Sequence, residues 1–96
     1  MTTKAHVVKE LENAKSRFAS ELGIRTLALF GSFARGEQTG HSDVDVLVDM
    51  TAPTFDHYMD LKFFLEDRLG TQVDLVIKDS LKERLRKRVE SEMINV

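Results

Sequence analysis

The segment that decides the fold is residues 24–49, with the sequence IRTLALFGSFARGEQTGHSDVDVLVD. A short apolar run ends in the pair Gly31-Ser32, and ten residues later a second apolar run opens with two acids, Asp43 and Asp45. We interpret each apolar run as a buried strand. Because side chains alternate along a strand, the two acids would point to the same face. They would repel each other there unless a proton or a cation lay between them.

A divalent cation that carries nucleotide phosphates would account for both features. Mg²⁺ prefers hard oxygen ligands and keeps several positions for water and phosphate, which suits Asp43 and Asp45. Backbone N–H groups around Gly31, Ser32 and Phe33, at the start of a helical turn, would hold phosphate oxygens. Glycine would let the phosphates approach closely. We therefore predict a metal–nucleotide site in this stretch.

Two further residues extend the predicted site. Asp74 interrupts another apolar run, and if its strand neighbours that of Asp43 it supplies a third carboxylate, suited to a second metal ion and to accepting the nucleophile's proton. Arg35 follows Ser32 within one helical turn, so its guanidinium would reach a phosphate or a partner, with a surface role equally open. Alone, each of these features would be an ordinary turn or a solvated residue; their joint occurrence favours the site.

The rest of the chain predicts helices and one more strand around this segment. The spacing of apolar residues predicts a helix over 3–22 and a second over 54–69, with a threonine as the N-cap of the second. A third strand is expected over 72–77, and Ser80 with Glu83 would form a capping box for a last helix. This order predicts an α/β or α+β fold, a small mixed sheet flanked by helices.

Composition limits the classes of function. At 96 residues the chain is expected to be a single domain, residues 1–96. Its 14 basic and 16 acidic residues nearly cancel, which implies no bulk attraction to nucleic acid or to a membrane. Cysteine is absent, which excludes disulfides and thiolate catalysis. No membrane-spanning run or signal-peptide pattern is present, and we expect a cytoplasmic protein.

Other polar residues are interpreted as surface residues. Asp49 is expected to be a solvated strand end, and His41 a loop residue. His6 and His57 lack the spacing of a zinc site. A basic run in the last predicted helix is interpreted as a solvated face, and without interleaved aromatic residues it gives no strong nucleic-acid signal. This run consists of Lys82, Arg84, Arg86, Lys87 and Arg88.

Three stretches of the sequence resemble the minimal nucleotidyltransferases (MNT proteins) of the polymerase-β-like nucleotidyltransferase superfamily. They are residues 29–36 (LFGSFARG), 42–48 (SDVDVLV) and 73–76 (VDLV). The resemblance spans the chain in element order, and it implies the polymerase-β-like fold. It also implies that Asp43 and Asp45 bind Mg²⁺, that Asp74 completes the triad, and that the Gly-Ser turn holds the triphosphate of ATP.

The resemblance also implies a partner. Larger relatives carry an added domain for the acceptor, and this chain is expected to lack one, so another protein would bind the acceptor or be the acceptor. Minimal members are often antitoxins that silence a HEPN ribonuclease toxin by transferring AMP from ATP to a toxin tyrosine. A protein adenylyltransferase with a HEPN partner is therefore the leading hypothesis.

Two alternatives stay open at this point. The chain could be a non-catalytic antitoxin that acts by occlusion, or a catalytic subunit that modifies a small molecule or RNA with a companion acceptor-binding protein. The intact set of three acids favours an enzyme, because a pure binding protein has no reason to tolerate their repulsion.

Overall fold

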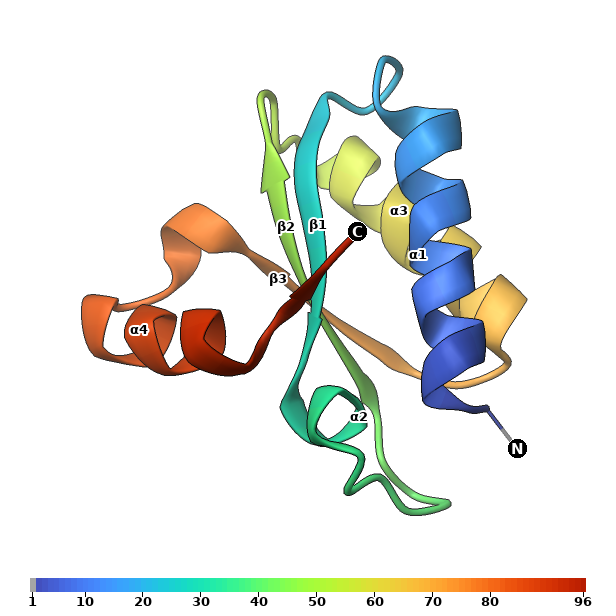
Figure 1. Ribbon diagram of the computed structural model, residues 1–96. Helices are drawn as coiled ribbons and strands as arrows, with labels where there is room; N and C mark the ends of the chain where they lie inside the picture. The colour runs from blue at the N-terminus through green and yellow to red at the C-terminus, as the bar shows by residue number, and fades with distance from the viewer. Residues whose placement is uncertain (1) are drawn as a thin grey trace.

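A four-stranded mixed sheet forms the centre of the molecule and carries helices on both faces (Figure 1). The computed structural model describes residues 2–96. In chain order the elements are α1 (Lys4–Phe18), β1 (Ile24–Phe30), α2 (Gly31–Arg35), β2 (Val44–Met50), α3 (Phe55–Leu69), β3 (Val73–Ile77), the 3₁₀ turn η1 (Lys78–Ser80), α4 (Glu83–Glu92) and β4 (Ile94–Asn95). The strand order is β3-β2-β1-β4. Strand β1 is antiparallel to β2 and β4, whereas β2 and β3 are parallel.

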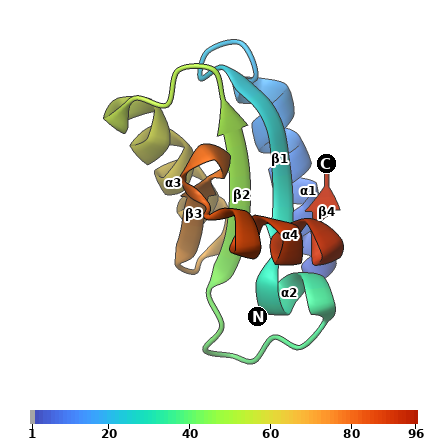
Figure 2. The ribbon, with the colours of Figure 1, turned by 90° about the vertical axis from the view of Figure 1, so that its left-hand side faces the viewer.

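The two faces of the sheet are covered by different helices because side chains alternate along the strands. Val44, Val46 and Val48 of β2 are buried in the main core, to which α1 and α3 contribute their apolar stripes. Leu47, which points the other way, joins Ala28 and the α4 residue Val89 in a smaller cluster. Figure 2 shows α4 in front of the sheet with α1 and α3 behind it. The predicted mixed sheet flanked by helices is confirmed.

Threonines begin both long helices. The hydroxyl of Thr3 accepts a hydrogen bond from the His6 N–H, and that of Thr54 accepts one from the His57 N–H, both at 3.1 Å. Such caps satisfy N–H groups that have no partner within the helix. Helix α3 ends at Leu69 before Gly70, as predicted from the sequence. No helix within residues 2–96 combines the length and apolar character that a membrane span requires.

The first helix is shorter than predicted. It ends at Phe18, and the chain continues in a turn in which the Leu22 N–H donates to the Phe18 carbonyl at 2.9 Å. Leu22 is nevertheless buried in the main core. The apolar spacing therefore continued beyond the helix because the turn returns Leu22 to the same core.

The predicted capping box is wrong. Ser80 lies in η1, where its hydroxyl donates to the Ile77 carbonyl at 2.7 Å. Helix α4 begins at Glu83, and its N-cap residue Lys82 supplies no side-chain hydrogen bond. The two-residue strand β4 was not predicted either; its Ile94 pairs with Leu29 of β1. Two residues are too few to show a periodic pattern.

Candidate active site

The backbone at Gly31, where the chain passes from β1 into α2, lies directly against the side chain of Asp45. Strand β1 ends at Phe30, and Gly31 begins α2 with a φ of +75°, a conformation that favours glycine. A Cβ atom at Gly31 would collide with the carboxylate of Asp45, whose Cγ and Cβ would lie 2.9 and 3.1 Å away. The sequence needs glycine here for both reasons. The backbone of the Gly-Ser pair and the second acid of the Asp-x-Asp motif are therefore in direct contact.

The sheet register places two acids side by side. Asp45 of β2 is the partner of Asp74 on the parallel strand β3. Paired residues on neighbouring strands present their side chains on the same face. Asp43 lies just before β2 begins, two residues from Asp45, so all three acids belong to the same end of the β2–β3 pair.

The electrostatic environment of Asp45 reflects this grouping. The pKa of Asp45 is raised to about 6, first by burial of its carboxyl group and then by the negative charges of Asp74 and Asp43. We expected repulsion between the acids to raise a pKa, and it contributes, but loss of solvent around Asp45 is the larger cause. The carboxylate that touches Gly31 is thus one whose surroundings disfavour its ionised form.

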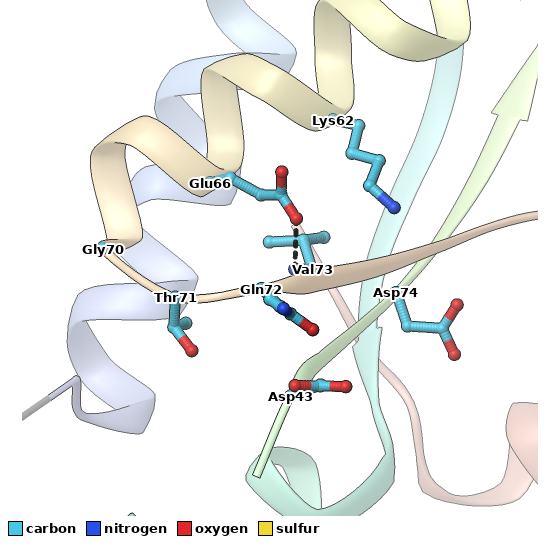
Figure 3. A pocket seen from close by; sticks show the side chains of 8 residues that line it. All are labelled: Asp43, Lys62, Glu66, Gly70, Thr71, Gln72, Val73 and Asp74. Atoms are coloured by element: carbon cyan, nitrogen blue, oxygen red, sulfur yellow. Dashed lines mark hydrogen bonds between the residues drawn. The ribbon is translucent and has the colours of Figure 1, made fainter. Parts of the chain in front are cut away.

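Asp43 and Asp74 line a cleft of about 690 Å³ beside strand β3. Figure 3 shows Lys62 and Glu66 reaching toward β3 from α3, with Asp43 and Asp74 near the start of the strands. Glu66 is held in place because it accepts the Val73 N–H at 3.0 Å. The remaining lining residues come from the α3–β3 connection and are Gly70, Thr71 and Gln72.

Asp45 faces a second cleft, of about 340 Å³, on the side of α2 and α4. Gly31, Ser32 and Arg35 line it together with Asp45, and Arg88 and Glu92 line it from α4. One cleft thus contains Asp45 with the predicted nucleotide-binding residues Gly31, Ser32 and Arg35, and the other contains Asp43 and Asp74.

The three acids do not form a closed metal cluster. Within residues 2–96, no group of three or more acidic, histidine or cysteine side chains is arranged to hold a metal ion. The donor set still fits Mg²⁺, because Asp45 and Asp74 are sheet partners with hard carboxylate oxygens. A cation that drew the acids together would also relieve the repulsion that helps to raise the pKa of Asp45.

The Gly31 N–H, which we expected from the sequence to hold phosphate, already has a hydrogen-bond partner. The Gly31 N–H donates to the Glu92 carboxylate at 3.3 Å. Phe33 is buried in the main core with 3% of its surface exposed, so only its backbone could meet a ligand. Ser32 is partly exposed and lines the cleft.

Arg35 is already paired. Its Nε donates to Glu37 at 2.9 Å, and its Nη1 donates to Glu92 at 3.0 and 3.1 Å. Hydrogen bonds to Glu92 and then to Glu37 raise the pKa of Arg35. The guanidinium lies at the edge of the second cleft, within the residues that line it.

Sequence reasoning missed two charged residues of the site. Glu92 is 57 residues from Arg35 and 61 from Gly31, and no local pattern marks it. Lys62 carried a weak signal, because Lys62 and Glu66 lie four residues apart and therefore on one face of α3. Only the packing of α3 beside β3 shows that this face meets the acids.

The residues interpreted as surface groups differ in outcome. Asp49 is not a solvated strand end, because it lies within β2, its side chain is 19% exposed, and its carboxylate is 4.0 Å from Arg25. The antiparallel β1 strand supplies that partner. His41 is an exposed loop residue, as expected.

Comparison with known proteins finds a matching family and related sequences. The family model described as the nucleotidyltransferase domain matches residues 11–96. The protein adenylyltransferase MntA of Thermococcus cleftensis is 38% identical over 97 residues, a match that covers 100% of this chain and 98% of that protein.

Two solved structures share the fold. One, described as a minimal nucleotidyltransferase, aligns with a TM-score of 0.85 at 35% identity and covers 98% of this chain and 96% of that chain. The other is a toxin–antitoxin complex with AMP-PNP, which aligns with a TM-score of 0.71 at 25% identity and covers 88% of this chain and 70% of the matched chain.

Proposed function

Because the chain belongs to the nucleotidyltransferase domain family, as a minimal nucleotidyltransferase, we propose that it transfers AMP from ATP to a tyrosine hydroxyl of a cognate HEPN ribonuclease toxin. The observation that carries the proposal is the contact of Asp45 with Gly31 while Asp45 is also the sheet partner of Asp74. In this arrangement a pair of carboxylates lies beside a turn whose backbone a phosphate group can approach closely. The relative named protein adenylyltransferase and the toxin–antitoxin complex with AMP-PNP support the choice of AMP, ATP and a toxin.

The nucleotide occupies the cleft beside α2 in this proposal. Backbone N–H groups of Gly31, Ser32 and Phe33 hold phosphate oxygens, and Arg35 offsets their charge. All but Phe33 line that cleft, and the positive φ of Gly31 keeps its backbone free of a side chain.

Asp43, Asp45 and Asp74 would hold Mg²⁺, which when bound supplies charge neutralisation for the triphosphate. In the transfer, the acceptor oxygen forms a bond to the α-phosphorus of ATP, and the bond between that phosphorus and the pyrophosphate oxygen breaks. Asp74 accepts the proton of the acceptor hydroxyl. Asp74 is exposed and lines the larger of the two clefts, so it is accessible to an acceptor hydroxyl.

The test is incubation of the purified pair with ATP and Mg²⁺, followed by intact-mass analysis of the partner. We expect added AMP units with the native chain and none with Asp43→Asn or Asp45→Asn. Asp49→Asn is the matched control, since it removes a carboxylate from the same strand outside the cluster and should leave transfer intact.

If both acid variants neutralised the toxin as well as the native chain, with no added mass on the partner, the antitoxin would act by occlusion. Transfer to RNA or to a small molecule, with an unmodified partner, would instead reject the protein acceptor. Either result would overturn the proposed function.

A further inference from the structure

Glu92, the last residue of α4, lies among the groups proposed to bind phosphate. Its carboxylate accepts the Gly31 N–H at 3.3 Å, and Arg35 Nη1 donates to both of its oxygens at 3.1 and 3.0 Å. Glu92 also lines the cleft that contains Asp45 and Ser32. A negatively charged side chain of the protein thus takes the hydrogen bonds that a phosphate would take.

We propose that Glu92 is an internal competitor of the nucleotide: its carboxylate holds Arg35 and the Gly31 N–H in the free chain, and phosphate binds only by displacing it. The inference rests on the proposed function, because it takes Gly31 and Arg35 as phosphate-binding groups. Glu92 does not touch the reacting atoms in this scheme. It sets the affinity for the nucleotide by controlling the groups that bind it.

The charges around Arg35 support competition. Arg35 is shared between Glu92 at 3.0 Å and Glu37 at 2.9 Å, so two carboxylates neutralise one guanidinium. In this state Arg35 presents no net positive charge to an incoming anion. Glu92 also lines the same cleft as Asp45, so two carboxylates lie in this cleft. An anion entering this cleft would meet Glu92 and Asp45 as like charges.

The position of Glu92 allows displacement at low cost. Val89 is the one buried residue of α4 among the residues described, and Glu92 lies near the end of the helix, two residues before β4. The Glu92 side chain is 20% exposed, so it can turn toward solvent without opening the core. The same position links the nucleotide cleft to α4, because a movement of the helix end changes the contact between Glu92 and Arg35.

The experiment compares the native chain with Glu92→Gln by titration calorimetry. The amide keeps the size of the side chain and an oxygen for the Gly31 N–H, but it removes the charge. We expect the Kd of Mg²⁺–ATP to fall by about twofold to fivefold, the range that a partly exposed ion pair supports. Inorganic tripolyphosphate should show the same gain, because the competition is for phosphate groups. Circular dichroism would verify that the fold is retained.

Two variants make the test specific. Glu90→Gln removes an exposed carboxylate from the same helix and should leave the Kd unchanged. In an Arg35→Gln background, Glu92→Gln should give little or no gain, because no guanidinium remains to be released; the double-mutant cycle isolates this coupling.

An unchanged Kd for Glu92→Gln would overturn the competition while leaving the proposed function intact. A raised Kd would also overturn it, and would show instead that Glu92 orients Arg35 for phosphate. Absence of ATP and tripolyphosphate binding in every folded variant would overturn the proposed function and this inference together.

Discussion

Gly31 and Asp45 are packed so closely that a methyl group on Gly31 would lie against three atoms of the Asp45 side chain. Gly31 begins α2 and Asp45 lies in β2, and their contact joins the Gly-Ser turn to the acids. A change at either residue is therefore expected to affect the other.

The first prediction concerns Gly31→Ala. The variant combines the strain of a positive φ with a collision at Asp45, so the free energy of unfolding should fall by about 2–4 kcal/mol. Gly36→Ala is the matched control: Gly36 has a φ of +72° and nothing within 4 Å of an added Cβ. It should lose only about 1 kcal/mol. If urea denaturation gave equal losses in the free energy of unfolding for the two variants, the collision with Asp45 would be easily relieved.

The second prediction concerns stability and pH. Because the pKa of Asp45 is raised to about 6, its ionised form weakens the fold. This penalty is absent below the unfolded pKa of about 4 and is fully present once the pH has risen through about 6. Asp45→Asn should therefore raise the free energy of unfolding at pH 8 by about 1 kcal/mol after allowance for solvent screening, and with it the melting temperature. The gain should vanish toward pH 4. Asp49→Asn should show no such gain.

The third prediction concerns metal dependence. ATP should raise the melting temperature only when Mg²⁺ is present, since ligand binding to the native state stabilises it. The shift should shrink as the pH falls through about 6, because protonated Asp45 no longer attracts a cation. A shift of equal size with EDTA, or one unaffected by Asp45→Asn, would count against coordination by the carboxylates.

The fourth prediction concerns the attachment of α4. Val89 is 7% exposed and packs with Ala28 and Leu47, so Val89→Ala should cost about 1–2 kcal/mol in the free energy of unfolding. Leu85→Ala on the same helix should cost about 0.5 kcal/mol or less, because Leu85 is 44% exposed. Hydrogen exchange should show faster opening of α4 in the Val89 variant. An equal loss in the free energy of unfolding for both variants would mean that α4 packs differently.

Local patterns accounted for much of the fold. The apolar run that opens with Asp43 and Asp45 identified β2, and the apolar spacing with a threonine N-cap identified α3. These features depend on backbone geometry over a few residues. The ends of α1 and α4 could not be predicted in the same way, because Leu22 reaches the core from a turn and Ser80 bonds to Ile77 rather than to the helix.

The sequence by itself determined the turn at Gly31 and the strand that carries Asp45, because the special conformation of glycine and the apolar character of a buried strand are local properties. The tertiary structure alone decided that Asp74 is the partner of Asp45 and that Glu92 holds Arg35 and the Gly31 N–H. Those relationships join residues that are far apart in the chain. They exist only once α3 has carried the chain over to β3 beside β2 and α4 has packed against the opposite face of the sheet.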